Sequence, residues 1–317
     1  MKRFVLTICA LLLLVPAARA GEDSLRVMFW NLENFFDWID EGRGESDSEF
    51  SSGGKRHWTR RRFETKCNAI AKTLMWEADR CGRMPDIVGF AEVENAGVLR
   101  MLLRTTALSK FGYAFVHYDS DDPRGIDVAL LYRRSRLELL GSDTLKTASL
   151  LTRDILTCAF RTSEGNVLNV MVNHHPSKYG GRSSEAKRIR VMERMLHRAD
   201  SLQKEAPLLV MGDFNDVPDG EAPEMAGKSL DNLALPLHDR GEGTIYYAGR
   251  WEMIDMFMLG GGLQSPGMEI LYPPLLLTRD SAHSALKPFR TWSGPRWTGG
   301  VSDHLPIVLK VYDIRPG

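Results

Sequence analysis

The sequence predicts an α/β or α+β fold in which strands and helices pack as layers. Short apolar segments rich in branched residues recur along the chain, and charged segments with apolar residues at helical spacing lie between several of them. The 317 residues are 43% hydrophobic and 26% charged, which excludes collagen-like, coiled-coil and low-complexity proteins. No linker or internal repeat divides the chain, so we expect one domain over residues 21–317.

The first 20 residues have the pattern of a secretory signal peptide. Two basic residues precede an apolar run over 4–15, and residues 18–20 read Ala-Arg-Ala, a small-x-small cleavage site. We therefore expect an exported protein, periplasmic or extracellular, that starts near Gly21. No later segment has the ~18 to 20 uninterrupted apolar residues of a membrane span, so we expect no stable membrane insertion. Without the first 20 residues, 38 basic and 41 acidic side chains remain, and charge alone does not predict a nucleic-acid partner.

The strands are predicted from short apolar runs. Eight segments are rich in branched or aromatic residues, as buried strands are: 25–30, 86–90, 126–132, 155–161, 167–172, 208–211, 253–259 and 306–311. Between the first two, residues 37–52 are acidic and unperiodic, which indicates a surface loop. Residues 260–300, rich in Gly and Pro, have no clear assignment.

The helices are predicted from spacing and capping. Thr59 can cap a helix whose apolar residues, from Phe63 through Cys67 to Leu74, recur at helical spacing. If that helix continued to Cys81, the two cysteines would be ~21 Å apart, beyond the ~7 Å limit for a disulfide. Further helices are predicted near 98–103 and over 184–202.

Polar residues follow four of the predicted strands at a spacing of i, i+2. The pairs are Asn31 and Glu33, Glu92 and Glu94, Asn173 and His175, and Asp213 and Asn215, with a further acid–base doublet at Asp303-His304. On an extended chain this spacing points both side chains of a pair to one face. A single pair is more often a strand entering a solvated turn, whereas four pairs favour a shared site at the strand ends.

The residue types at these positions define the chemistry. Carboxylates and amides without thiolates favour a hard cation, Mg²⁺ or Mn²⁺, over zinc. His175 and His304 can stabilise or protonate phosphate oxygens, and Asp213 can orient or deprotonate an attacking water. These are the groups of metal-assisted phosphoester hydrolysis. The chain lacks Gly-x-Ser-x-Gly, His-Glu-x-x-His and a Gly-rich nucleotide loop, which argues against serine hydrolases, zinc proteases and P-loop proteins.

Six short motifs resemble those of the endonuclease/exonuclease/phosphatase superfamily, in order and rough spacing. They are Trp30-Asn31-Leu32-Glu33-Asn34, Ala91-Glu92-Val93, Asn173-His174-His175, Gly212-Asp213-Phe214-Asn215, Ile254-Asp255 and Ser302-Asp303-His304. The similarity spans residues 25–311. It implies an α/β fold that is a four-layered α/β/β/α sandwich, with two packed mixed β-sheets and the site at one rim.

The resemblance also implies a metal site. Glu92 matches the family's metal-binding Glu, Asn31 matches the Asn beside it, and Glu33 lies where some members have a second acid. Asp303 resembles the acid that faces the metal region. The expected cofactor is Mg²⁺, with Mn²⁺ or Ca²⁺ as alternatives. Asn31 and Asp303 also fit purely structural roles, as a turn residue and a cap.

Catalytic roles follow from the same resemblance. Asp213 matches the Asp that positions the nucleophilic water, and Asn215 the amide that supports the transition state. His304 matches the histidine at the scissile phosphate, and Asp255 the acid that orients it. His175 corresponds to the phosphate-contacting histidine, while the neighbouring His174, like Glu94, is expected to be structural or at the surface.

Three basic elements are candidates for substrate binding. Arg124, in Arg-Gly-Ile-Asp, can bring a guanidinium to the phosphate, although a loop salt bridge is an equal alternative, and Lys178 is a similar case. The basic run over 55–62 contains Trp58 and several arginines, which fits nucleic-acid stacking and phosphate contacts. A solvated helix start explains that run nearly as well.

The substrate is expected to be nucleic acid. The residues around Asp213 and Asp255 depart from the motifs of inositol phosphatases, which counts against an inositol phosphate as the substrate. The loop after His175 looks most like those of secreted bacterial nuclease-like members. The alternatives are a phosphomonoesterase or a lipid phosphodiesterase of the sphingomyelin type, and then a catalytically silent binding protein. Nothing in the sequence indicates an obligate protein partner, or decides between DNA and RNA.

Overall fold

The structure is a computed structural model of the chain. It describes residues 24–42, 44–147, 150, 152–178, 181–312 and 314. The signal peptide predicted for residues 1–20 lies outside the described residues. Within them, no helix is long and apolar enough to cross a membrane.

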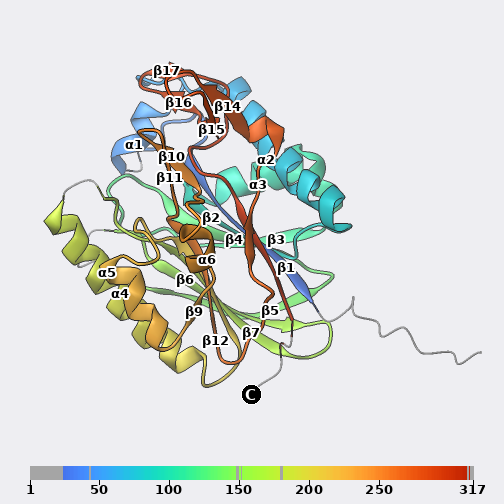
Figure 1. Cartoon of the computed structure of the whole chain (residues 1–317). Helices are drawn as coiled ribbons and strands as arrows, with labels where there is room; N and C mark the ends of the chain where they lie inside the picture. Colours follow the sequence, from blue (N-terminus) through green and yellow to red (C-terminus); the bar gives the residue numbers. More distant parts are fainter. Residues whose placement is uncertain are drawn as a thin grey trace, which may run out of the picture.

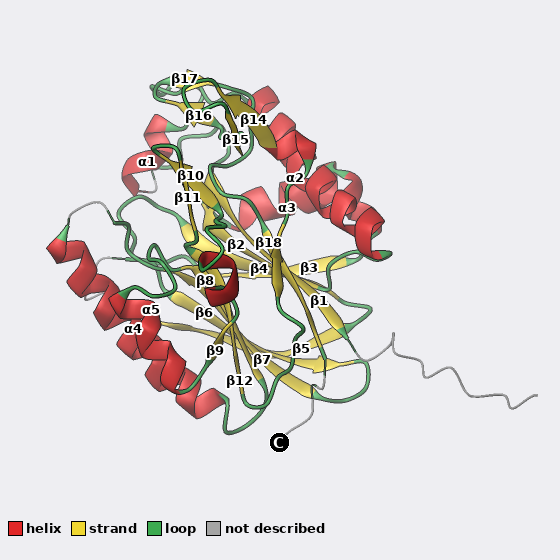
Figure 2. Ribbon diagram, viewed as in Figure 1, coloured by secondary structure: helices red, strands yellow, loops and turns green. Residues whose placement is uncertain are grey.

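Two six-stranded sheets pack face to face at the centre of the molecule (Figures 1 and 2). The first has the order β13 (Met268–Ile270), β18 (Ile307–Val311), β1 (Leu25–Phe35), β2 (Ile87–Val93), β4 (Asp127–Arg133) and β3 (Tyr113–His117). The second has the order β5 (Leu137–Leu145), β6 (Ile155–Thr162), β7 (Val167–His174), β8 (Leu208–Asp213), β12 (Asp255–Gly260) and β9 (Asp231–Asn232). Each is mixed, because β1–β2 and β7–β8 are parallel while their other pairs are antiparallel.

Helices cover the outer face of each sheet, as Figure 2 shows. On the first sheet lie α2 (Arg60–Cys81) and α3 (Ala96–Thr105), and on the second lie α4 (Arg182–Leu202) and α5 (Glu221–Glu224). The shorter helices are α1 (Gly44–Glu49), η1 (Ala107–Lys110), η3 (Met225–Lys228), α6 (Leu235–His238) and η4 (Pro274–Leu276). The predicted α/β/β/α sandwich is therefore confirmed.

The longest helix, α2, begins and ends where local chemistry predicts. Thr59 caps its N-terminus, where its hydroxyl accepts from the Arg62 amide, and Gly82 ends it in the left-handed conformation with a φ of 80°. Cys67 and Cys81 both lie in this one helix, and both are free, as is Cys158.

Two parts of the chain differ from the predictions. The predicted loop over 37–52 contains α1, and strands β3 and β5 were not foreseen. The unassigned segment after residue 260 supplies β13 and two hairpins, β14–β15 (Leu277–Asp280 and Ala285–Pro288) and β16–β17 (Trp292–Ser293 and Arg296–Trp297). These lie at one end of the sandwich near a third hairpin, β10–β11 (Ile245–Tyr247 and Arg250–Glu252) (Figure 1).

The packing of the two sheets brings their parallel strand pairs together. A Cβ atom built on Gly89 of β2 would lie 2.8 Å from the Met211 sulfur of β8, so the sheets approach closely here. Strands β1, β2, β7 and β8 end at the same rim, where the Asn31 amide on β1 reaches Asp213 on β8. The site is built at this rim.

Candidate active site

Asp213 is a buried carboxylate whose two oxygens both accept hydrogen bonds. It ends β8 and is 1% exposed. Its Oδ2 accepts a hydrogen bond from the side chain of Asn31 (Nδ2) at 2.9 Å, and its Oδ1 accepts one from the backbone N–H of Asn215 at 2.9 Å. Residue 212 must be glycine, because a Cβ there would lie 2.4 Å from the carbonyl oxygen of Asn173 on the adjacent strand. Burial raises the pKa of Asp213 to about 7, although the charge of His304 opposes this rise. The two hydrogen bonds therefore orient the carboxylate, and burial brings its pKa close to neutral pH.

His304 faces Asp213 and is oriented by Asp255. Its Nδ1 lies 2.8 Å from Asp255 Oδ2, and its Nε2 lies 3.8 Å from Asp213 Oδ2. Burial lowers the pKa of His304, but the charges of Asp255 and Asp213 outweigh burial and raise that pKa well above its usual value. Asp255 lies directly opposite Asp213 in the β8–β12 register. We call Asp213, Asp255 and His304 the reaction centre.

The structure brings His174 to the reaction centre in place of the predicted His175. His174 ends β7 opposite Asp213, and its Nε2 lies 3.6 Å from Asp213 Oδ2. The His175 ring packs on Phe214, and neither of its nitrogens has a partner among the described residues. Burial, with the charge of Arg188, lowers the pKa of His175 to about 3. The i, i+2 spacing predicted that Asn173 and His175 share the face of the site, whereas Asn173 donates to Met211 O within the sheet.

Left-handed backbone conformations cluster at the site. Glu33, Asn34, Glu92 and Asn215 have φ angles of 48°, 56°, 62° and 50°, a conformation that costs on the order of 1 kcal/mol for such residues. The strand register also shifts beside them, between Asn31 and Phe35 and between Phe90 and Val93. Such irregularities re-aim side chains, so the i, i+2 alternation does not hold here.

Glu92 and Glu94 illustrate that effect. Glu92 Oε2 accepts from the Asn34 amide at 2.7 Å, whereas Glu94 Oε2 accepts from the Asp37 amide at 2.8 Å. Burial raises the pKa of Glu92, but the charges of Arg124 and Arg153 outweigh burial, so that its pKa is lowered. Glu92 is therefore an ionised carboxylate at the rim, and Glu94 lies outside the site.

A second group of charges, the acid–cation cluster, consists of Glu33, Asp303, Lys66 and Arg290. Glu33 is 4% exposed and accepts from the Thr291 amide at 2.6 Å. Arg290 Nη2 lies 3.4 Å from Glu33 Oε1 and 3.1 Å from Asp303 Oδ2. Burial and the charge of Asp303 raise the pKa of Glu33 to about 8 despite the two cations.

Lys66 is a residue that sequence reasoning missed. It is 2% exposed, and its Nζ donates to Glu33 O at 2.6 Å and to Thr291 Oγ1 at 2.9 Å. Burial lowers the pKa of Lys66 to about 8, while the charges of Glu33, Glu92 and Asp303 oppose that effect. Its signal in the sequence is a lysine on the apolar face of the predicted helix, between Phe63 and Ile70.

Two arginines flank Glu92. Arg124 Nη2 donates to Asn34 Oδ1 at 2.8 Å and lies 3.6 Å from Glu92 Oε2, so the structure places this predicted residue at the rim. Arg153 was missed: it is 6% exposed, its Nε lies 3.2 Å from Asp122 Oδ2, and its charge acts on Glu92 and Asp213. In the sequence, an arginine directly before a buried strand is only a weak sign of a site residue, because the packing of the sheets decides where its side chain points.

A pocket of about 340 Å³ adjoins the site at Asn215. Its lining comes from the loop after β7, the β10–β11 hairpin and the residues before β12: Ser177, Lys178, Asn215, Ile245, Tyr247, Glu252 and Ile254. Lys178 forms an ion pair with Glu252 at 2.8 Å, and Tyr247 is 67% exposed. The predicted Lys178 therefore lies beside the reaction centre, already paired with an acid.

The basic run over 55–62 packs largely against the protein itself. Trp58 is 1% exposed and donates to Phe36 O at 2.8 Å, so its ring is not available for base stacking. The guanidinium carbon of Arg56 lies 5.1 Å from the Trp292 ring centre, and that of Arg62 lies 4.8 Å from the Trp297 ring centre. These contacts hold the start of α2 against the β16–β17 hairpin, which corrects the stacking role expected for Trp58.

Four predicted ligands at the rim carry the oxygen atoms that a hard divalent cation prefers. Glu92, Asn31, Glu33 and Asp303 offer carboxylate and amide oxygens. Among the described residues, however, Glu92, Glu33 and Asp303 do not form one of the groups whose donor atoms lie within 4.8 Å of one another. Burial and the charge of Asp303 raise the pKa of Glu33, and a cation bound beside it would oppose both effects. The three donor atoms of the reaction centre do lie within 4.8 Å of one another and form a group able to hold a metal ion.

Comparisons with known proteins agree with this geometry. Residues 26–313 match the model of the Endonuclease/Exonuclease/phosphatase family. Protein angel of Drosophila melanogaster is 27% identical over 201 residues, 57% of this chain and 56% of that protein, so this chain spans little more than half its length.

Solved structures share the fold at low identity. D. rerio TDP2 complexed with single-strand DNA product has a TM-score of 0.59 at 15% identity, covering 91% of this chain and 98% of that one. The human Nocturnin catalytic domain with bound sulfate anion has a TM-score of 0.58 at 18% identity, covering 91% and 93%. A Bacteroides thetaiotaomicron mannosyl-6-phosphatase has a TM-score of 0.57 at 16% identity, covering 90% and 99%. The chain therefore belongs to the Endonuclease/Exonuclease/phosphatase family, whose members are divalent-metal-dependent hydrolases of phosphoester bonds.

Proposed function

We propose that this protein is an exported, Mg²⁺-dependent nuclease that hydrolyses phosphodiester bonds by in-line attack of a water molecule. The main observation supporting hydrolysis is Asp213, a buried carboxylate oriented by two hydrogen bonds and facing two imidazoles. Export rests on the signal pattern of residues 1–20.

Each residue of the reaction centre has a distinct role in this proposal. Asp213 accepts the proton of the attacking water, which its pKa of about 7 allows near neutral pH. His304, held by Asp255 in its protonated form, donates a hydrogen bond from Nε2 to the phosphoryl group. His174 takes the phosphate-contacting role first expected of His175, since it is the histidine that faces Asp213.

The arginines and the metal site act on the developing negative charge. Arg124 and Arg153 provide fixed positive charge beside Glu92. Glu92, Asn31, Glu33 and Asp303 would hold a divalent cation, which when bound stabilises charge on a phosphoryl oxygen. Lys66 and Arg290 hold the two outer acids of this set in position.

A diester is favoured over a monoester by the pocket beside Asn215. An apolar wall of Ile245 and Ile254, with the exposed ring of Tyr247, suits an organic group on the leaving side of the phosphate. The Lys178–Glu252 ion pair offers that group both a donor and an acceptor. A nucleotide has such a ring with polar edges, which is why nucleic acid is the proposed substrate.

One assay separates this proposal from its alternatives. The purified protein should be tested with plasmid DNA, single-stranded DNA, RNA, 4-nitrophenyl phosphate and sphingomyelin, each with Mg²⁺ and with excess EDTA. We expect cleavage of a nucleic acid with Mg²⁺ and none with EDTA. Release of phosphate from the monoester alone would indicate a phosphomonoesterase, and cleavage of sphingomyelin alone a lipid phosphodiesterase.

The metal site has a matched pair of variants. Glu92→Gln should raise the Mg²⁺ concentration needed for half-maximal activity, because it removes an ionised carboxylate at the rim. Glu94→Gln, two residues away, should leave that concentration unchanged, since Glu94 hydrogen-bonds to the Asp37 amide instead. Full activity of the parent protein in excess EDTA would exclude the metal-dependent mechanism.

A further inference from the structure

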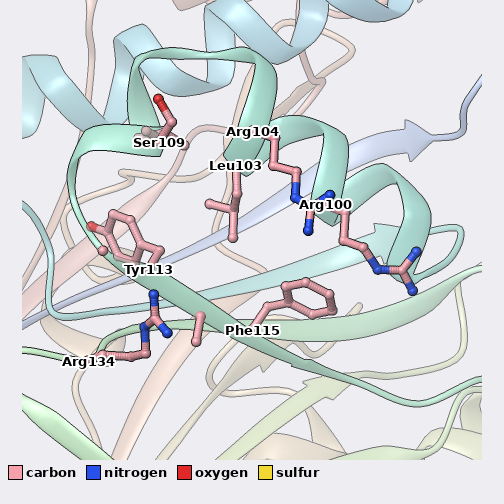
Figure 3. Close-up of a pocket in the computed structure, with 10 residues that line it drawn as sticks. Arg100, Leu103, Arg104, Ser109, Tyr113, Phe115 and Arg134 are labelled. Carbon is pink, nitrogen blue, oxygen red and sulfur yellow. The ribbon is translucent and has the colours of Figure 1, made fainter.

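A separate pocket of about 470 Å³ lies between α3, η1 and the start of β3 (Figure 3). Three arginines contribute to it: Arg100 and Arg104 from α3, and Arg134 from the turn after β4. Figure 3 shows their side chains around the hollow between the helix and the strand. None of the site residues described above lines this pocket, so its function is a separate question.

The three guanidinium groups are not paired with a carboxylate of the described residues. Within the part of the chain that the structure describes, no ion pair or side-chain hydrogen bond involves any of them. Two arginines close to Arg134 in the sequence do have an acid beside them: Arg133 and Arg136 lie 3.5 Å and 3.6 Å from the buried Asp86.

The placement of these charges on α3 is unfavourable without a partner. Arg100 and Arg104 are four residues apart on one helical face, where like charges repel. The helix dipole favours Arg104, in the last turn, but does not account for Arg100 or Arg134. An anion bound between the three would relieve this repulsion.

The floor of the pocket is apolar. Leu103 and Tyr113 are buried beside the half-buried Phe115. The Tyr113 hydroxyl donates to Pro85 O at 2.5 Å, so this residue offers the pocket its ring and not its hydroxyl. A ligand here therefore needs an apolar, flat part as well as negative charge.

The surroundings favour a small ligand over a nucleic-acid strand. Arg100 also lines the neighbouring pocket, whose other side chains include Glu41 and Asp119. A polyanion continuing past Arg100 in that direction would meet these two acids. A compact anion confined between the arginines avoids that repulsion.

We propose that this pocket binds a small organic phosphate, with the phosphate between Arg100, Arg104 and Arg134 and an aromatic ring on the apolar floor. A nucleoside monophosphate has this chemistry. The volume is in the range of small-ligand sites, and guanidinium groups pair with phosphate oxygens through two parallel hydrogen bonds. Binding here is independent of the reaction centre, and does not require that the protein is a nuclease.

The test is calorimetric titration of the full chain with AMP in EDTA. We expect saturable binding, weakened about tenfold or more in the double variant Arg104→Gln/Arg134→Gln, because two of three charge-assisted contacts are lost. The matched control Arg61→Gln changes an exposed arginine of α2 and should bind AMP as the parent does. Lys178→Gln should also bind AMP as the parent does, because Lys178 lines the pocket beside the reaction centre and not this one.

Two further arms identify the ligand chemistry. Inorganic phosphate and adenosine should each bind more weakly than AMP, because each lacks one half of the recognised group. Equal affinity of the parent and the double variant for AMP would overturn the proposal, as would absence of binding at millimolar AMP. Circular dichroism checks that the double variant is folded, which is expected because both arginines are exposed.

Discussion

The reaction centre and the acid–cation cluster both bring acids and bases together at the same rim, but they are held differently. Asp213 and Asp255 lie opposite each other on adjacent strands, so the sheet register sets their geometry. Glu33 is instead held by a lysine from α2 and by residues near the β16–β17 hairpin. The first region depends on the central sheet, and the second on elements that pack against its edge.

The difference indicates that orientation matters in the reaction centre and that charge balance matters in the acid–cation cluster. In the reaction centre each side chain has at least one close, directional partner, which suits a group that must face a substrate. In the cluster the partners mainly supply positive charge and fill backbone acceptors. We therefore expect changes in the first region to act on turnover, and changes in the second to act on stability and metal affinity.

The largest expected effect is that of Asp213→Asn. Loss of the proton acceptor should lower kcat by about 10² to 10⁴-fold with little effect on folding. The matched control Asp231→Asn changes an exposed aspartate at the edge of the same sheet and should leave kcat unchanged. Steady-state kinetics with a small phosphodiester would measure both, and a loss below tenfold would show that Asp213 is not the base.

The pairing of His304 with Asp255 predicts strong non-additivity. Each of His304→Ala and Asp255→Asn should lower kcat, by about 10²-fold or more for the histidine, but the double variant should be little worse than His304→Ala alone. The reason is that Asp255 acts by orienting His304 across a 2.8 Å contact. If the two losses multiply, the residues act independently, and the reaction centre does not depend on the orientation of His304 by Asp255.

In the cluster, Lys66→Met should destabilise the protein by about 1 to 3 kcal/mol, because it leaves two buried acceptors without a donor. Lys72→Met changes an exposed lysine of the same helix and should shift the free energy of unfolding by less than about 0.5 kcal/mol. Urea denaturation of the three proteins measures this directly. Equal midpoints for both variants would mean that Lys66 contributes nothing to stability.

The pH dependence of kcat should reflect the reaction centre. Asp213 must be ionised to accept a proton, and burial raises its pKa to about 7, so activity should fall about tenfold per pH unit as the pH drops below 7. His304 must be protonated, and its pKa is raised, so activity should also fall at alkaline pH.

Asp255→Asn tests the alkaline limb. It removes a charge that raises the pKa of His304, so the fall in activity should begin at a lower pH in this variant. A profile of residual activity from pH 5 to 10 is the measurement. An alkaline limb that stays in place would assign it to another group.

The smallest effect is expected for Arg290→Gln. Its ion pairs with Glu33 and Asp303 involve a side chain that is 51% exposed, and such pairs contribute about 0 to 1 kcal/mol. A thermal melt should therefore distinguish it clearly from Lys66→Met. A loss as large as that of the buried lysine would show that the exposed cation, too, is structural.

Much of the fold follows from local patterns in the sequence. The branched segments predicted most of the two sheets, and Thr59 with the apolar spacing after it predicted α2. Strands β3 and β5 were missed, and the segment over 260–300 has short strands whose partners are mostly local hairpins. Strands of two to four residues contain too few apolar positions to show a period, so their pattern is weak.

The reaction centre was predictable as a set of motifs. Asp213, Asp255 and His304 were singled out before any geometry, and the fold brings all three together. Their position at strand ends is a local property of each motif. That they meet is a property of the family's order of strands, which the resemblance supplied.

What the sequence by itself determined is the layered α/β class, the capped helix and the ordered motifs, since these depend on spacing within one segment. Only the tertiary structure decided that His174 and not His175 faces Asp213, that Lys66 and Arg153 are buried at the rim, and that Trp58 is covered. The physical reason is that bulges and left-handed residues interrupt the alternation of side chains, and they are stabilised by contacts between segments far apart in the chain. Burial of a charged or aromatic side chain likewise depends on which distant element packs over it.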